Sequence, residues 1–265
     1  MDIDKLYNIF TTCGGKVATD SRKISGGELF FALKGENFDG NEYALKALEA
    51  GAAYAVVDKN SPVSAAAADE PRLIPVPDAI LALRALARYH RDRFAIPVLG
   101  LTGTNGKTTT KELINAVLSA RFRTHATCGN LNNNIGVPLT ILGMPADTEI
   151  AVIEMGASHP GDIKELVDIA APDFGLITNV GKGHLLGFGS FEGVKATKGE
   201  MYDFIAENGG GAGTVFINQD NPLLVEMATS RGFVTMPECC AFDRAAFLGR
   251  DRRKCASKKL LAVPY

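Results

Sequence analysis

Residues 96–109, Ile-Pro-Val-Leu-Gly-Leu-Thr-Gly-Thr-Asn-Gly-Lys-Thr-Thr, decide the fold. An apolar run that is typical of a strand ends at Gly103, and a helical pattern follows the loop from Lys111 onward. A glycine loop between strand and helix that ends in Gly-Lys-Thr is the arrangement that holds a nucleoside triphosphate. The alternative is an ordinary strand-to-helix turn, which this order of residues disfavours.

The loop contains the groups that a triphosphate needs. Glycines let backbone N–H groups turn toward phosphate oxygens, and the helix N-terminus adds partial positive charge. Lys107 is predicted to reach the β- and γ-phosphates, and Thr108 to hold Mg²⁺. The common P-loop has a glycine where this chain has Leu101, so the loop here is tighter. The predicted nucleotide contacts are Gly103, Thr104, Asn105, Gly106, Lys107, Thr108 and Thr109.

The composition is that of an ordinary globular protein. Charged residues make up 22% of the 265 residues, apolar residues make up 46%, and the net charge is −2. With this net charge we expect neither a nucleic-acid nor a membrane partner. No stretch approaches the ~20 apolar residues of a membrane span. The polar first residues are unlike a signal peptide, which favours the cytoplasm. The five cysteines form neither a zinc pattern nor an even disulfide set.

Residues 1–93 are predicted to form a separate small α/β unit, because strands and helices alternate there. Within it, Ser21-Arg22 places an arginine beside a hydroxyl, which suits a phosphate or diphosphate. A solvated turn is the alternative, and these residues alone favour it. The expected strands are 29–33, 52–58 and 72–76, and the expected helices are 42–49 and 78–93.

Residues 94–231 are predicted to form a second α/β unit with a mostly parallel sheet. Residues 126–138 place four asparagines between two glycines, which suits a ligand loop, although a plain Asn-rich turn is equally compatible. Residues 151–158 are an apolar strand with Glu154 near its carboxyl end, where ligands bind in such sheets. A buried carboxylate needs a partner, so Glu154 is either a metal ligand or half of a structural ion pair.

Two further residues are candidates for metal chemistry. His184 follows the strand at 174–180, so it lies at a carboxyl end, although a lone histidine is more often structural. Residues 191–207 have helical period, and Lys198 falls inside their apolar stripe. This lysine either snorkels, which spacing alone favours, or is functional. Burial lowers the pKa of a lysine, and the neutral amine can react with CO₂ to form a metal-binding carbamate.

Seven segments together resemble the Mur ligase family, most closely the branch that adds D-alanyl-D-alanine to UDP-N-acetylmuramoyl-tripeptide. The Asn-rich loop and the segment from His184 to Glu200 are specific to this branch. The P-loop alone would indicate only a Mur-like protein. The segments are 19–22, 29–40, 103–109, 129–140, 154–157, 179–190 and 198–200.

The resemblance implies a role for each matching position. Lys107, His184 and Lys198 would be the catalytic group, with Lys107 on the ATP phosphates. Thr108 and Glu154 would hold one Mg²⁺, and His184 and a carbamylated Lys198 would hold a second. The first unit would bind the UDP-sugar, and the Asn-rich loop would face the sugar-peptide. The implied substrate contacts are Ser21, Arg22, Lys34, Asn37, Phe38, Asn130, Asn132 and Asn133.

The implied reaction is an ATP-dependent ligation in peptidoglycan precursor synthesis. The carboxylate of UDP-N-acetylmuramoyl-tripeptide attacks the γ-phosphate of ATP, and an acyl phosphate forms. The amine of D-alanyl-D-alanine then displaces phosphate. Two anions can approach each other only with metal and lysine charge between them. We expect a monomer.

The match to the family fades after Pro222, and the central domain is incomplete. Residues 232–265 show no regular period and become basic, so we expect a truncated or frame-shifted tail that is poorly ordered. A nucleic-acid patch is the minor alternative for this tail. We expect the third domain of the family, which takes the incoming amine, to be missing from this chain. A fragment that binds nucleotide or UDP-sugar without turnover is therefore the competing function, and a Mur ligase for another amino acid is a weaker one.

Overall fold

The computed structural model describes residues 2–35, 37–208, 213–235 and 259–263. The chain divides into two compact units, residues 1–93 with 141–143, and residues 94–140 with 144–265. Both are α/β units, and every pair of neighbouring strands in their two sheets is parallel. The α/β class expected from the sequence is confirmed.

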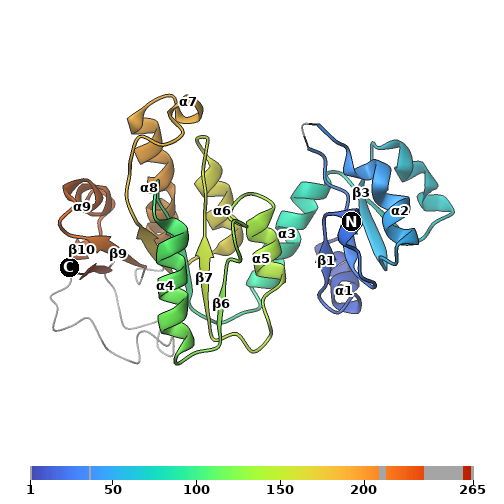
Figure 1. Ribbon diagram of the computed structural model, residues 1–265, viewed down its shortest axis with the longest axis horizontal. Coiled ribbons are helices and arrows are strands. Elements are labelled where there is room, and N and C mark those ends of the chain that lie inside the picture. Colours follow the sequence, from blue (N-terminus) through green and yellow to red (C-terminus); the bar gives the residue numbers. More distant parts are fainter. Residues whose placement is uncertain (1, 36, 209–212, 236–258, 264–265) are drawn as a thin grey trace. The chain divides into compact units, whose positions relative to one another are not determined.

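The first unit is built on a four-stranded sheet of order β1-β2-β3-β4 (Figure 1). Its strands are short apolar runs, and its longest helix, α3, starts where the Asp78 carboxylate accepts the Leu81 N–H at 2.9 Å. The strands are β1 (Val17–Ala18), β2 (Leu29–Phe31), β3 (Tyr54–Asp58) and β4 (Leu73–Val76). The helices are α1 (Ile3–Thr12), η1 (Ser21–Lys23), η2 (Gly40–Tyr43), α2 (Ala44–Glu49), η3 (Pro62–Ala68) and α3 (Ala79–Arg91).

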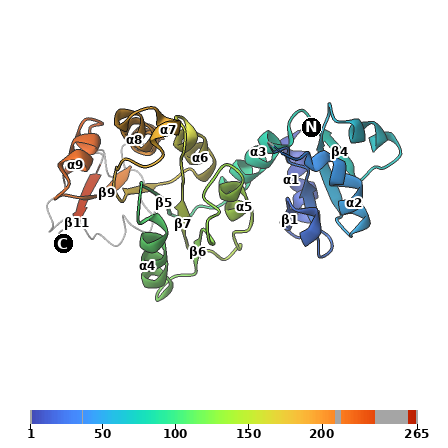
Figure 2. The same cartoon turned by 45° about the horizontal axis from the view of Figure 1, so that its top comes forward.

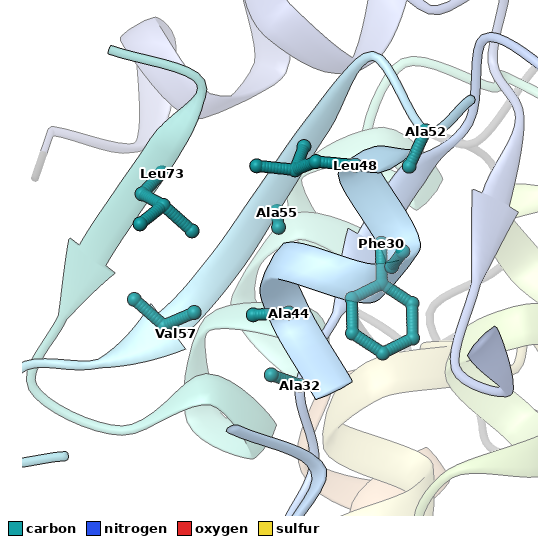
Figure 3. Close-up of a cluster of buried hydrophobic side chains, with 9 residues drawn as sticks. Phe30, Ala32, Ala44, Leu48, Ala52, Ala55, Val57 and Leu73 are labelled. Carbon is teal, nitrogen blue, oxygen red and sulfur yellow. The ribbon is translucent and has the colours of Figure 1, made fainter. Parts of the chain in front are cut away.

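The core of the first unit lies between helix α2 and the sheet. Small residues of α2 let it approach the strands closely, so that Leu48 packs beside the side chains of β2, β3 and β4 (Figure 3). Close packing of this kind removes apolar surface from water and holds the helix in one position. The buried cluster includes Phe30, Ala32, Ala44, Leu48, Ala52, Ala55, Val57 and Leu73.

The second unit is built on a seven-stranded sheet of order β10-β11-β9-β8-β5-β7-β6. Its central strands are buried on both faces, which explains their continuous apolar runs. The strands are β5 (Val98–Thr102), β6 (Thr124–Ala126), β7 (Ile150–Glu154), β8 (Phe174–Ile177), β9 (Thr214–Asn218), β10 (Val234–Thr235) and β11 (Lys259–Val263). The helices are α4 (Lys107–Ser119), α5 (Gly136–Leu142), α6 (Asp162–Ala170), α7 (Leu185–Phe188), α8 (Phe191–Asn208) and α9 (Pro222–Thr229).

The helices of the second unit cover the sheet unequally. Helix α4 lies on one face of the sheet, and α6, α8 and α9 lie on the other, as Figure 2 shows. Helices α6 and α8 pack against each other, and α4 packs on β5, β6 and β7. Strand β5 lies between β7 and β8, so the direction of the crossovers reverses there. The carboxyl end of β5 is therefore the topological switch point, where ligands bind in such sheets.

The structure adds elements that the sequence analysis did not predict. Helix α1 was not expected, and neither was the 3₁₀ helix η3. The Asn-rich segment is shorter than predicted, because helix α5 already begins at Gly136. Two stretches of the tail, Val234–Thr235 and Lys259–Val263, are strands, whereas 236–258 lie outside the described residues. In the part of the chain that the structure describes, no helix is long and apolar enough to cross a bilayer.

Candidate functional site

The loop between β5 and α4 has a backbone that requires glycine. Gly103 has a φ of +150° and Gly106 a φ of +76°, and L side chains rarely adopt either conformation. A Cβ on Gly103 would also overlap the Thr178 hydroxyl at the end of β8. Glycine at these two positions therefore lets the loop turn tightly beside the neighbouring strand.

The loop is tied to the segment that follows β8. The Asn105 N–H donates to Asn179 Oδ1 at 3.0 Å, and the Asn179 amide donates back to the Asn105 carbonyl at 3.0 Å. The Thr178 hydroxyl donates to the same carbonyl at 2.7 Å, and the Thr104 hydroxyl accepts the Gly181 N–H at 2.9 Å. These bonds hold the loop in shape, which lowers the entropic cost of ordering it around a ligand.

Lys107 lies folded back over this loop. Its Nζ donates to the Gly103 carbonyl at 2.9 Å and to the Thr104 carbonyl at 3.3 Å. Lys107 is also the first residue of α4, so its ammonium adds to the partial positive charge of a helix N-terminus. An anion placed at the loop would therefore meet backbone N–H groups, the helix end and an ammonium group together.

Glu154 ends strand β7 beside the loop and is completely buried. Its Oε1 accepts a hydrogen bond from Asn132 Nδ2 at 2.8 Å and one from the Thr108 hydroxyl at 3.3 Å. Its main-chain N–H donates to the Thr127 hydroxyl at 2.9 Å. Its Oε2 is buried and has no hydrogen-bond partner within the described residues. The partners of Glu154 in the described residues are neutral, so they do not form the structural ion pair that the sequence left open.

The orphaned oxygen of Glu154 fits a divalent cation. A buried carboxylate oxygen without a partner is costly, and hard cations prefer carboxylate and hydroxyl oxygens. The Thr108 hydroxyl lies on the same carboxylate, so two ligands of the expected kind are together. No cluster of three or more His, Cys, Asp or Glu gathers in metal-binding geometry within the described ranges. A cation at Glu154 would therefore complete its coordination with phosphate and water oxygens, as Mg²⁺ does.

Lys198 lies in helix α8 and is only 2% exposed. Burial, and then the positive charge of Lys107, lowers the pKa of its amine to about 8. It has no hydrogen-bond or ion-pair partner among the residues that the structure describes. Only 2% of the residue is exposed, so the structure buries this lysine far more than the snorkelling that spacing alone favoured. The structure instead places this lysine close to the P-loop lysine.

A pocket of about 440 Å³ lies beside Lys107 of the P-loop and Asn132 of the Asn-rich loop. His184 lines it and begins helix α7 with a φ of +53°, an unusual left-handed conformation for a histidine. Asp162 also lines it, and its Oδ2 accepts the N–H groups of Ser158 and His159 at 2.7 and 2.8 Å. The lining residues are Lys107, Asn132, Asn133, Asn134, Gly156, Ala157, Ser158, His159, Asp162, Glu165, Leu166 and His184.

The three predicted asparagine contacts have different surroundings. Asn132 and Asn133 line the pocket, whereas Asn130 is exposed and is not part of its lining. Asn133 Oδ1 accepts the Gly136 N–H at 2.8 Å and so supports the start of α5. Asn132 directs its amide to Glu154.

The predicted UDP-sugar contacts lie in the first unit. Arg22 is exposed, and its guanidinium forms two 2.9 Å hydrogen bonds to Asp20, which lower the pKa of that carboxyl to about 2. Ser21 shares the short helix η1 with Arg22, and η1 contacts α2. Lys34 pairs with Asp39 at 4.0 Å across a tight loop.

The remaining predicted contacts of the first unit lie on that tight loop. Phe38 is 59% exposed, and its ring covers Gly35 so closely that a Cβ there would displace it. Asn37 is exposed beside it. An exposed aromatic ring on a short loop offers a flat surface for another ring, and a nucleobase has such a face.

The sequence analysis missed several residues that shape the site. Thr178 and Asn179 hold the P-loop, and Asp162 organises the Ser158 turn. Glu200 accepts the N–H groups of Gly161 and Lys164 at 3.0 and 2.8 Å, which ties α8 to α6. Burial raises the pKa of Glu200. Polar residues directly after the apolar run of β8 were the signal that could have identified the first two.

Comparisons with known proteins agree with this geometry. The Mur ligase middle domain matches residues 101–241, which is more than half of the chain, and the Mur ligase catalytic domain family matches residues 16–91. A MurF ligase of Thermotoga maritima, solved in complex with ADP, superposes with a TM-score of 0.71 at 33% identity. That match covers 82% of this chain and 48% of the other. MurF from Acinetobacter baumannii gives a TM-score of 0.71 at 34% identity, over 81% of this chain and 46% of the other.

Curated relatives point the same way. UDP-N-acetylmuramoyl-tripeptide--D-alanyl-D-alanine ligase of Bacillus subtilis is 44% identical over 208 residues, which are 78% of this chain and 44% of the relative. The ligase of the same name from Escherichia coli is 42% identical over 77% of this chain and 43% of its own length. The chain thus spans less than half the length of these relatives. Matching domains, superposed structures and a preformed nucleotide loop together show that this chain belongs to the Mur ligase family.

Proposed function

We propose that this chain provides the nucleotide-binding and UDP-sugar-binding parts of an ATP-dependent ligase that joins D-alanyl-D-alanine to UDP-N-acetylmuramoyl-tripeptide. The observation that carries the proposal is the group of Lys107, Thr108 and Glu154 around the Gly103–Gly106 loop, with an orphaned carboxylate oxygen. The names of the Bacillus subtilis and Escherichia coli relatives state that those proteins are ligases for these two substrates. The proposal also takes support from the neighbour solved with ADP.

In this proposal the chain's own groups neutralise and orient the triphosphate. The loop N–H groups and the Lys107 ammonium bind phosphate oxygens, in exchange for the carbonyl contacts that the ammonium now makes. Thr108 and Glu154 would hold one Mg²⁺, and His184 with a carbamylated Lys198 would hold a second. Metal charge there would stabilise the attack of the tripeptide carboxylate on the γ-phosphate. ADP leaves as the acyl phosphate forms, and the amine of D-alanyl-D-alanine then attacks the acyl carbon and displaces phosphate.

The first unit would contribute recognition of the UDP-sugar. Arg22, with its planar fork of donors, suits the diphosphate, once it exchanges the Asp20 carboxylate for phosphate oxygens. Phe38 suits the uracil face. Replacing Arg22 should weaken UDP-sugar binding without changing ADP binding. Arg22 belongs to the first unit, whereas the Gly103–Gly106 loop belongs to the second.

The test of the proposed function is phosphate release from ATP. The full chain is incubated with ATP, Mg²⁺, UDP-N-acetylmuramoyl-tripeptide and D-alanyl-D-alanine, and each substrate is omitted in turn. Release that needs all components and yields the extended peptide supports the proposal. Release that needs meso-diaminopimelate, lysine or D-glutamate in place of D-alanyl-D-alanine would assign a different Mur ligase.

A second function competes, because the chain spans less than half the length of its curated relatives. Here the chain binds nucleotide or UDP-sugar and releases no phosphate. Well-folded protein that binds ADP but is inactive with the complete substrate set would support this second function.

A further inference from the structure

The Glu154 carboxylate is asymmetric in its surroundings. Oε1 accepts both of its side-chain hydrogen bonds, from Asn132 at 2.8 Å and from Thr108 at 3.3 Å. Oε2 is equally buried and has no partner in the described residues. Because Thr108 is itself a candidate metal ligand, Asn132 is the neighbour that can keep the carboxylate in one orientation when Thr108 turns to a cation.

Asn132 is anchored independently of its side chain. Its carbonyl accepts the Gly156 N–H at 2.7 Å, two residues beyond Glu154, and its own N–H donates to the Asn130 carbonyl at 2.8 Å. A Cβ on Gly156 would come within 3.0 Å of Asn132 Oδ1, so this end of β7 leaves the amide little freedom. Asn132 therefore bonds to Glu154 at the end of β7 and to Gly156 just after it. The second bond holds the backbone of Asn132 in place while its amide donates to Glu154.

An amide is chemically suited to this task. It donates one hydrogen bond to Glu154 without placing a positive charge beside the carboxylate. A lysine or arginine in the same place would neutralise the carboxylate and compete with metal. Lys111, the buried lysine of α4, is bound instead to the Thr127 carbonyl at 2.7 Å and to Glu112 at 2.7 Å.

We propose that Asn132 is a positioning residue for the metal-binding carboxylate, fixing Glu154 through Oε1 so that Oε2 is left for a divalent cation. The inference rests on the proposed function, since it assumes that a metal–nucleotide complex binds here. It also assigns Asn132 a different role from the sugar-peptide contact that the family resemblance implied. Partners that orient a metal ligand commonly change metal affinity by about 10- to 100-fold when they are removed.

The experiment measures ADP binding by calorimetry, once with excess Mg²⁺ and once with a chelator. The variants are Asn132→Ala, Asn132→Gln and the control Asn115→Ala, whose side chain accepts a bond from Ser119 and no other within the described ranges. We expect Asn132→Ala to lose about 10- to 100-fold of the Mg²⁺-dependent affinity and to keep the chelator value. Asn132→Gln should recover part of the loss because it retains a donor. Asn115→Ala should match wild type in both conditions.

Each other outcome has a distinct meaning. Unchanged Mg²⁺ dependence in Asn132→Ala overturns the inference, and wild-type binding of Mg·ADP would leave the proposed function intact. Weaker binding with and without Mg²⁺ shows a merely structural role and also overturns it. An effect seen only on UDP-N-acetylmuramoyl-tripeptide affinity returns Asn132 to substrate recognition. Wild-type protein that binds ADP no better with Mg²⁺ contradicts the proposed function itself.

Discussion

Two helices of the second unit each bury a lysine, and the two lysines have opposite surroundings. Lys111 in α4 is 0% exposed, and its amine contacts the Thr127 carbonyl at 2.7 Å and Glu112 at 2.7 Å. Lys198 in α8 is 2% exposed, yet it has no polar partner within the described residues, and the Lys107 charge opposes its own. Both lysines lie on helices that pack on the same sheet.

The difference is between a buried lysine with polar partners and a buried lysine without them in the described residues. Lys111 has two oxygen partners, and its bond to the Thr127 carbonyl holds the segment after β6. Lys198 has no such compensation, so its amine gives up the proton more easily, with a pKa of about 8. At pH 7 about one molecule in ten would then hold the neutral amine, which is the form that reacts with CO₂. A carbamate there would replace repulsion with attraction toward Lys107.

The largest expected effect is on turnover. Lys198→Ala should lower phosphate release by at least about 100-fold, as expected when a charge-stabilising group is removed from an active site. Bicarbonate with wild type, or a short carboxylate with the variant, should raise the rate, whereas Lys111→Met should not respond to carboxylate. If Lys198→Ala releases phosphate at the wild-type rate, the reactive role assigned to this lysine is wrong.

The second expected effect is on the pH dependence of stability. Between pH 8 and 10.5 the unfolded lysine holds a proton that the folded Lys198 has released, so this residue makes the fold more stable as pH rises through that window. The contribution is on the order of 3 kcal/mol in the free energy of unfolding. Urea unfolding at several pH values should show this rise in wild type and not in Lys198→Met. Identical pH profiles would contradict the lowered pKa.

The third effect should fall on Lys111 alone. Lys111→Met leaves the Thr127 carbonyl without its donor, which costs about 1–3 kcal/mol of stability. Lys198→Met removes a buried group without a partner, so at pH 7 it should leave stability unchanged or raise it. Urea unfolding of the two variants side by side makes the comparison. Equal destabilisation by both would remove the distinction between the two lysines.

The smallest effect should come from the neighbouring charge. Lys107→Met removes the repulsion that contributes to the low pKa of Lys198, so this pKa should rise. The rise should be small, because burial is the larger cause of the lowered pKa and is still present in the variant. Nuclear magnetic resonance of ¹³C-labelled lysine side chains can follow this titration. No change on removing Lys107 would place the two amines too far apart to share one site.

Local chemistry made much of the fold predictable. The apolar run of β5, the glycine loop and the Asp78 cap of α3 depend on neighbours in sequence, so their residue types were sufficient. Helix α1 was missed, although Asp2 caps it in the same way. The early start of α5 was missed because it depends on the Asn133 side chain turning back to the Gly136 N–H.

The site was predictable in its parts and not in its arrangement. Gly-Lys-Thr and Glu154 could be recognised individually, because their positions after strands indicate ligand binding. The Asn132 contact with Glu154 could not be predicted, because these residues are 22 positions apart in the sequence. They meet only because strands β5, β7 and β6 are neighbours in the sheet. The spacing of α8 favoured snorkelling for Lys198, because periodicity describes which face a residue is on and not how far water is from its amine.

The most direct test of the central claim is to locate metal and phosphate in a crystal of this chain grown with ADP and Mn²⁺. The account predicts an anomalous Mn²⁺ peak on Glu154 Oε2 and the Thr108 hydroxyl, with ADP phosphates on the Gly103–Gly106 loop and Lys107. Phosphates bound elsewhere, or a metal that leaves Glu154 Oε2 without a ligand, would contradict it.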